Sequence, residues 1–254
     1  MEISAEVVGV GAPIIRFRSG QVQEMTGLSG SPIVAVDLGF SKDKRSCGLA
    51  WKMPDGSTGE DELEFGECAD RVSALMCNGP QSVLILEAPL SGLFNANGNP
   101  RSRGDFEQMI KDGELKQRDW YWGAGPPTCL AAIYFCQKLR SQLRGAMPLG
   151  AGLTVVLFEG FLSFKTDGSP HGEDARRLLE EFLHPEGASR AVSVTPGEGE
   201  TVIALSEILG DEANPPAPPV LVVRYQPPAT AETAQGESGT WNTAPPRTGH
   251  GEGQ

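Results

Sequence analysis

The stretch that decides the fold is Ile33-Val34-Ala35-Val36-Asp37-Leu38-Gly39. It is short and almost wholly apolar, which is typical of a strand that is buried on both faces of a sheet. An acidic side chain, Asp37, stands near the end of this run. A carboxylate there is costly to bury unless it lies at the open end of the strand and is hydrogen-bonded or bound to a metal. Asp37 is therefore the first candidate for a functional residue.

The chain around this stretch predicts further strands. Residues 46–52 and about 59–65 have strand-like patterns, and Pro54-Asp55-Gly56 between them is a turn motif. Three sequential strands joined by short turns predict an antiparallel meander. Upstream, residues 7–17 are rich in apolar and β-branched side chains and predict a strand or hairpin that leads into a loop at 27–32.

Beyond the meander, helical and strand patterns alternate along the chain. Helices are predicted over residues 68–77, 127–144 and 170–184, and apolar strands over residues 82–87 and 153–158. Residues 88–119 are predicted to be irregular, residues 200–209 a short helix and residues 220–225 a strand. This order of elements is that of an α/β, RNase H-like mixed sheet, in which an antiparallel meander and parallel strands joined by right-handed crossovers are flanked by helices.

Length and composition predict one folded domain with extensions at both ends. Of the 254 residues 39% are hydrophobic, which is enough for a proper core. We expect an N-terminal strand or hairpin extension at 1–30, an RNase H-like domain at 31–225 and a disordered Pro/Gly-rich tail at 226–254. The sequence shows no secretory signal, no apolar run that would span a bilayer and no CxxC pair among its five cysteines. These features predict a cytoplasmic protein with free thiols and no membrane contact.

The formal net charge of −12 limits the partners that the chain can bind. Broad, non-specific binding of nucleic acid depends on Lys and Arg, which displace counterions from phosphates. A nuclease is still compatible with this charge, because a metal-binding cluster is itself acidic and a local basic patch can coexist with an acidic total. Nucleic acid therefore remains the expected partner, with a partner protein as the alternative.

Three further acids join Asp37 as candidates for one site. Glu87 ends the second buried strand, Glu159 follows the third, and Asp174 lies in the first turn of the last long helix. In open α/β sheets ligands bind at the carboxyl ends of parallel strands, where these side chains could meet. Clustered carboxylates suit Mg²⁺ or Mn²⁺, and two such ions about 3.5–4 Å apart can cleave a phosphodiester. The alternatives are a helix-dipole role for Asp174 and a solvent-facing Glu87.

The motifs that carry these acids resemble a known group of proteins. They are Ile33-Val34-Ala35-Val36-Asp37-Leu38-Gly39, Leu84-Ile85-Leu86-Glu87-Ala88-Pro89, Val156-Leu157-Phe158-Glu159 and His171-Gly172-Glu173-Asp174-Ala175. In this order they resemble the RuvC-like and DUF429-like branch of the RNase H superfamily, over about residues 33–184. The resemblance implies metal-dependent nuclease chemistry, with Asp37, Glu87 and Asp174 as metal ligands. It matches Glu159 to the acid on the penultimate strand, and His171 stands where the RuvC-like helix often carries a second acid.

Several other side chains have both a functional and a structural interpretation. His171 is a metal ligand or general base, since its ordinary pKa lies near neutrality, or else a solvent-exposed residue at a helix start. Arg101 and Arg103 clamp phosphate or belong to a solvated loop. Lys165 contacts phosphate or forms an ion pair. The aromatic cluster Trp120-Tyr121-Trp122 stacks on bases or packs against the core.

Two alternative functions share the predicted fold. Asp37-Leu38-Gly39-Phe40-Ser41 also fits the phosphate loop of actin-like and sugar-kinase ATPases, in which Ser41 would approach phosphate and Asp37 would hold Mg²⁺ through water. Those proteins usually have two such domains and a second Gly-rich motif, which the sequence lacks. The second alternative is a catalytically degenerate RNase H-like module that binds a protein. It is favoured if Glu87 and Asp174 turn away from Asp37 in the fold.

Overall fold

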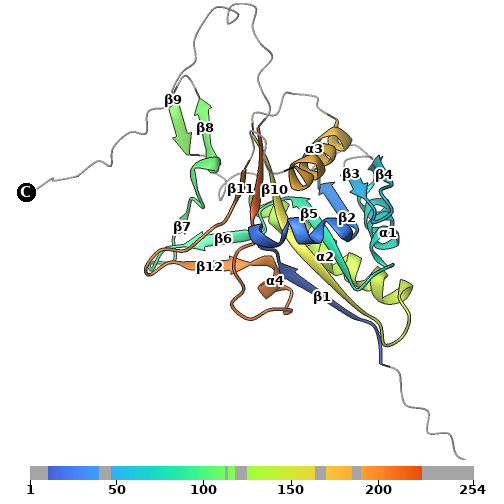
Figure 1. Cartoon of the computed structure of the whole chain (residues 1–254). Helices are drawn as coiled ribbons and strands as arrows, with labels where there is room; N and C mark the ends of the chain where they lie inside the picture. The colour runs from blue at the N-terminus through green and yellow to red at the C-terminus, as the bar shows by residue number, and fades with distance from the viewer. Residues whose placement is uncertain are drawn as a thin grey trace, which may run out of the picture.

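A computed structural model of the chain describes residues 11–39, 47–111, 114–117, 125–163, 170–184 and 190–224 (Figure 1). Its centre is an eight-stranded mixed sheet with the order β11-β13-β10-β5-β2-β3-β4, and β1 lies beside β10. The strands are β1 (Ile14–Ser19), β2 (Ile33–Asp37), β3 (Cys47–Lys52), β4 (Thr58–Leu63), β5 (Gln81–Glu87), β10 (Gly152–Ser163), β11 (Arg190–Val192) and β13 (Val220–Arg224). The predicted α/β class with a mixed sheet is confirmed.

The two halves of the sheet differ in strand direction. Strands β2, β3 and β4 form the predicted antiparallel meander, and β5 pairs with β2 in parallel. Strand β10 in turn is parallel to β5 and also to β1 and β13. Strand β10 is longer than predicted because two strands pair with it in succession along the edge away from β5: β1 with its first half and β13 with its second half.

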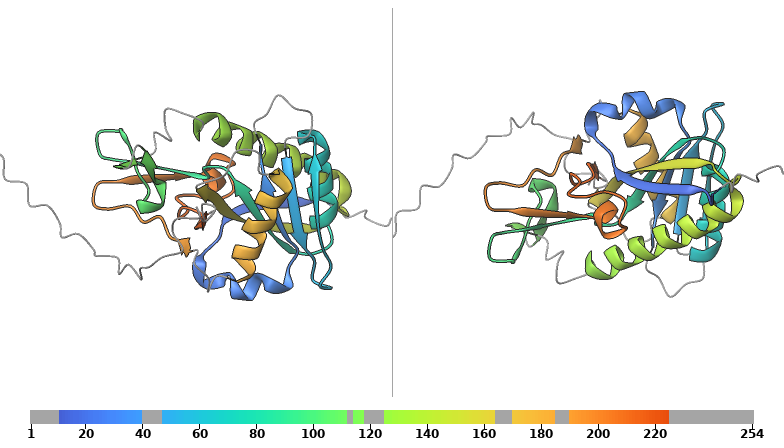
Figure 2. Two further views of the ribbon diagram at one scale, coloured as in Figure 1. Left: turned by 90° about the horizontal axis from the view of Figure 1, so that it is seen from above. Right: turned by 90° about the horizontal axis from the view of Figure 1, so that it is seen from below.

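Three long helices cover the two faces of the sheet. Helices α1 (Phe65–Met76) and α2 (Gly125–Ala146) pack together on one face, and α3 (His171–Leu183) covers β2 and β3 on the other (Figure 2). All three lie where the sequence predicts helices. Within the described ranges, no helix has both the length and the apolar character needed to cross a membrane.

The double covering explains why the β2 run is apolar without alternation. Val34 and Val36 belong to the core beneath α1 and α2, whereas Ile33 and Ala35 belong to the core beneath α3. Side chains of a strand alternate between the faces, so both sets must be apolar when both faces are covered. By the same alternation Asp37 emerges on the α3 face.

The segment between β5 and α2 differs from the prediction. Residues 88–119 are not wholly irregular but contain β6 (Ser91–Phe94), β7 (Pro100–Arg101), β8 (Gln108–Lys111) and β9 (Glu114–Gln117). Strand β6 pairs with β7 and with β12 (Thr201–Ala204), and β8 pairs with β9. These strands project from the main sheet (Figure 1). The partner of β6 in β12 lies more than a hundred residues further along the chain, so no local periodicity reveals that pairing.

Two other segments also gain structure from long-range pairing. The predicted helix at 200–209 is strand β12 followed by a single short helix, α4 (Leu205–Ile208). The N-terminal segment contributes β1 to the main sheet, and the free edge of β1 is capped by side chains: Asp211 accepts the Phe17 N–H at 3.0 Å and Glu212 accepts the Ser19 N–H at 2.9 Å. The predicted tail at 226–254 lies outside the described residues.

Candidate metal site

Three side chains from β2 and α3 meet at one end of the sheet. Asp37, His171 and Asp174 each present a ligand-type atom, and these atoms all lie within 4.8 Å of one another. The Nδ1 atom of His171 is 2.6 Å from Oδ2 of Asp37. We call these three residues the β2–α3 cluster.

The local structure accounts for the convergence of the three residues. Asp37 is the last residue of β2 and points towards α3 by the alternation described above. His171 and Asp174 lie three positions apart in the first turn of α3, so both side chains fall on the same side of the helix. Because α3 lies across β2 and β3, that side meets the end of β2.

The burial of the cluster favours a bound cation. Asp37 is 3% exposed and Asp174 is 0% exposed, whereas the His171 side chain retains 28% of its accessible surface. Two carboxylates that are removed from water at such short range repel each other unless positive charge is nearby. Carboxylate oxygens with one imidazole form a donor set that suits Mn²⁺ and related divalent ions, and carboxylates alone suit Mg²⁺. These donors therefore fit the predicted Mg²⁺ or Mn²⁺.

Glu87 lies next to the cluster without being part of it. It pairs in register with Asp37 in the adjacent parallel strand, so both side chains emerge on the α3 face of the sheet. The group of three atoms within 4.8 Å does not include Glu87. The structure thus brings Asp37 and Asp174 together with His171, the candidate metal ligand or general base, and leaves Glu87 as a neighbour.

Glu159 lies on the opposite face of the sheet. Its neighbour Phe158 belongs to the core beneath α3, so Glu159 points the other way. Its Oε2 atom accepts the Leu90 N–H at 2.8 Å and a hydrogen bond from Nη1 of Arg103 at 2.6 Å. Burial raises the pKa of Glu159, while Arg103 and the Leu90 N–H act to lower it. The expected convergence of Glu159 with Asp37 does not occur.

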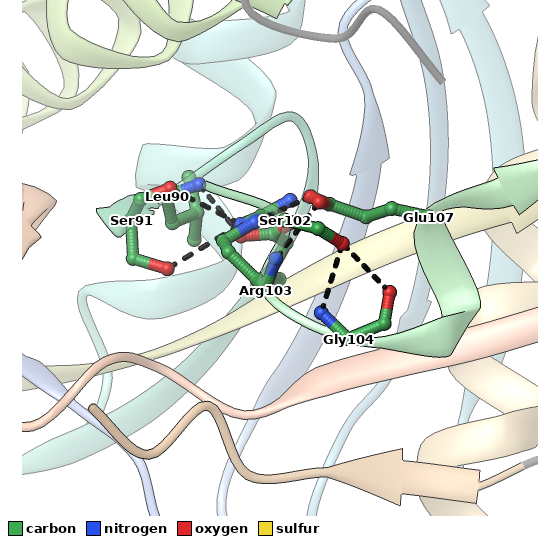
Figure 3. A network of polar contacts seen from close by, with 7 residues as sticks. Leu90, Ser91, Ser102, Arg103, Gly104 and Glu107 are labelled. Carbon is green, nitrogen blue, oxygen red and sulfur yellow. Dashed lines mark hydrogen bonds and ion pairs between the residues drawn. The ribbon is translucent and has the colours of Figure 1, made fainter. Parts of the chain in front are cut away.

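Arg103 is the centre of a second buried group, the Arg103 network (Figure 3). Besides Glu159, its guanidinium donates to Glu107 at 2.7 Å and to the carbonyl oxygen of Ser91 at 3.2 Å. The Arg103 side chain is 1% exposed. Arg103 is therefore neither an exposed phosphate clamp nor a residue of a solvated loop, and both interpretations of it from the sequence are wrong. Glu107 had no distinguishing feature in the sequence, because it lies in a stretch without periodicity.

The remaining candidates are placed as follows. Arg101 lies on the surface of β7 and forms an ion pair with Glu200. Ser41, Lys165 and the aromatic residues 120–122 lie outside the described residues.

The described surface has an apolar and a polar pocket near the two buried groups. An apolar pocket of about 280 Å³ lies between β6, α2 and α4, with Leu90 and Cys129 in its wall. A polar pocket of about 510 Å³ lies beside the first turn of α3 and is lined by β4 and α3 residues that include Glu60, Glu62 and Arg176. Its lining also includes Gly172, the residue after His171.

Comparisons with known proteins found no match to the chain. No protein-family model, no curated protein and no solved structure matches the chain. The geometry of the β2–α3 cluster is therefore the basis for its chemistry.

Proposed function

We propose that the protein is a metal-dependent phosphodiester hydrolase of the RNase H-like type that acts on nucleic acid. The observation that carries this proposal is the β2–α3 cluster, in which two buried carboxylates and an imidazole converge at the end of a central strand. The strand order supports it, because an antiparallel meander continues into parallel strands as in the RNase H-like arrangement. Glu87, in register with Asp37, supplies a further carboxylate beside the cluster.

Each residue of the cluster has a definite task in this proposal. Asp37 and Asp174 would hold Mg²⁺ or Mn²⁺ through carboxylate oxygens, and their attraction for the ion offsets their mutual repulsion. The contact between Asp37 and Nδ1 of His171 fixes the imidazole ring, as partners of metal-site histidines generally do. When bound, the metal lowers the pKa of a coordinated water and polarises the phosphoryl oxygen. Glu87 would orient that water or an additional ion from the neighbouring strand.

The acidic character of the chain is consistent with this chemistry. With a net charge of −12, the protein gains little affinity from counterion release. Recognition of the phosphodiester would then depend on the metal, and binding without it would be weak.

A nuclease assay on the full chain tests the proposal. Single- and double-stranded DNA and RNA are incubated with Mg²⁺ or Mn²⁺, with and without chelator. We expect cleavage by the wild type, and a loss of at least about 100-fold in Asp37→Asn and Asp174→Asn, since each removes a ligand charge. Glu60→Gln is the matched control: it also removes one acidic charge, but from the surface of β4. Equal activity in the wild type and Asp37→Asn would refute the proposal.

The alternative of a degenerate protein-binding module has a distinct outcome in the same experiment. It requires a wild type that binds neither Mg²⁺ nor Mn²⁺ and cleaves none of the four substrates. The ATP-binding alternative depends on Ser41, which is outside the described residues, and no described feature favours it.

A further inference from the structure

The β2–α3 cluster depends on how closely the first turn of α3 approaches the sheet. Four residues form a row across neighbouring strands: Glu87 pairs with Asp37, Asp37 with Gly48, and Gly48 with Glu62. Paired residues of adjacent strands point to the same face, so the row faces α3. It consists of three acids interrupted by one glycine.

The glycine marks the place where the helix backbone touches the sheet. A Cβ atom built on Gly48 would lie 1.8 Å from the carbonyl oxygen of His171 and 2.6 Å from the backbone nitrogen of Gly172. Both contacts are to backbone atoms, which cannot swing aside as a flexible side chain can. Any other residue at position 48 would therefore displace the first turn of α3 by about 1 Å or more, since packed atoms do not interpenetrate.

The next residue of the row, Glu62, binds the same turn of the helix. Oε1 of Glu62 accepts the backbone N–H of Gly172 at 3.2 Å. The first N–H groups of a helix have no partner within the helix, so a side-chain acceptor there fixes the helix end. An acid at this place also complements the positive end of the helix dipole.

We propose that Gly48 and Glu62 are the positioning residues of the metal site. Gly48 provides the space for the first turn of α3, and Glu62 anchors that turn through Gly172. Together they set the distance of His171 and Asp174 from Asp37. The inference rests on the proposed metal-dependent function, because it assigns these two residues to the same site. Neither residue belongs to the β2–α3 cluster itself.

Binding of Mn²⁺ to the full chain, measured by titration calorimetry, tests this role. We expect Gly48→Ala and Glu62→Met to weaken Mn²⁺ binding about 10–100-fold, which is the usual effect of losing an outer-shell partner. Glu62→Gln keeps an oxygen acceptor for the Gly172 N–H, so its affinity for Mn²⁺ should lie within a few-fold of that of the wild type.

Two control variants separate positioning from general effects. Glu60→Gln removes a carboxylate from the same face of β4, where Glu60 lies 3.7 Å from Arg176 rather than at the helix end. Gly152→Ala adds a methyl group to a strand glycine whose Cβ would meet nothing within 4 Å. Both should bind Mn²⁺ as the wild type does. Unchanged affinity in Gly48→Ala and Glu62→Met would overturn the inference.

A measurement without metal distinguishes failure of this inference from failure of the proposed function. Amide hydrogen exchange of Gly172 in the metal-free protein should be slow in the wild type and Glu62→Gln, and faster in Glu62→Met. If the wild type binds no Mn²⁺, the proposed function fails, and the exchange rates still decide whether Glu62 anchors the turn. If Gly48→Ala does not fold, the Glu62 variants decide the question by themselves.

Discussion

Buried carboxylates lie on both faces of the main sheet, but their partners differ between the two faces. On the face of α1 and α2, Glu159 and Glu107 share the guanidinium of Arg103. On the face of α3, Asp37 and Asp174 meet at the imidazole of His171. Arg103 is always charged and its planar fork of donors matches two carboxylates at once. A permanent cation of the chain thus holds the first group together, whereas in the proposed function the second group would bind an exchangeable ion.

The Arg103 network also connects separate parts of the fold. Arg103 precedes β8 and bonds to Ser91 at the start of β6, while Glu159 lies in the central strand β10. The network therefore ties the projecting strands to the main sheet. The β2–α3 cluster ties only the end of β2 to the start of α3.

The largest expected effect comes from removing the permanent cation. Arg103→Met leaves two buried carboxylates without their partner, so the free energy of unfolding should fall by about 3–5 kcal/mol. Urea denaturation followed by circular dichroism measures this change. Arg101→Met removes an arginine whose side chain is 55% exposed and should change the same quantity by less than about 1 kcal/mol. Similar values for the two variants would contradict the comparison.

The next effect distinguishes the β2–α3 cluster by its response to metal. At a concentration of Mn²⁺ about 100 times its dissociation constant, the wild type should gain about 2.7 kcal/mol in the free energy of unfolding. Asp174→Asn should lose most of that gain, because it removes a ligand charge. Without metal, the free energy of unfolding of the same variant should be at most about 1 kcal/mol lower than that of the wild type. A full metal response in Asp174→Asn would show that the ion binds elsewhere.

The pH dependence of the free energy of unfolding tests the group on the other face of the sheet, which contains Glu159. Burial raises the pKa of Glu159 above its ordinary value of 4.5, so the folded protein holds a proton that the unfolded chain releases. This contribution to stability is present below about pH 4.5 and is lost as the pH rises through the folded pKa. Glu159→Gln has no group that titrates at this position, so it should lack this decline. Parallel stability curves for the two proteins would contradict the assignment.

The smallest effect is expected at the surface of α3. Arg176 forms an exposed ion pair with Glu180 one turn further along the helix. Glu180→Ala should lower the free energy of unfolding by only about 0.3–0.5 kcal/mol, because water and salt screen such pairs. Its Mn²⁺ affinity should equal that of the wild type. A measurable loss of Mn²⁺ affinity in this variant would mean that surface residues of α3 also influence the β2–α3 cluster.

The accuracy of the sequence predictions follows the range of the interactions involved. The meander, the three long helices and the strands β5, β10 and β13 were predicted because their patterns are local. The strands β6 and β12 were not, because each pairs with a strand more than a hundred residues away. The same limit explains the error at Arg103: its position in the chain gave no sign that Glu159 would bury it.

The candidate site shows the same division. An acid at the end of an apolar strand singled out Asp37, and the spacing of His171 and Asp174 in one helical turn made them plausible companions. Nothing local predicted that Glu159 would face the other side, since its own position after an apolar strand looks like that of Glu87. The importance of Gly48 and Glu62 was equally hidden, because it arises from the approach of α3 to two strands that lie more than a hundred residues earlier.

The sequence by itself determined the strands that are buried on both faces, the long helices, and the acids that stand at their ends. These features follow from hydrophobic periodicity and from the cost of burying a charge, which act over a few residues. Only the tertiary structure decided which acids share a site. That choice depends on the register between strands and on the face from which each helix approaches, and both are set by contacts between residues far apart in the chain. Asp37 and Glu159 therefore look alike in the sequence and lie on opposite faces of the sheet.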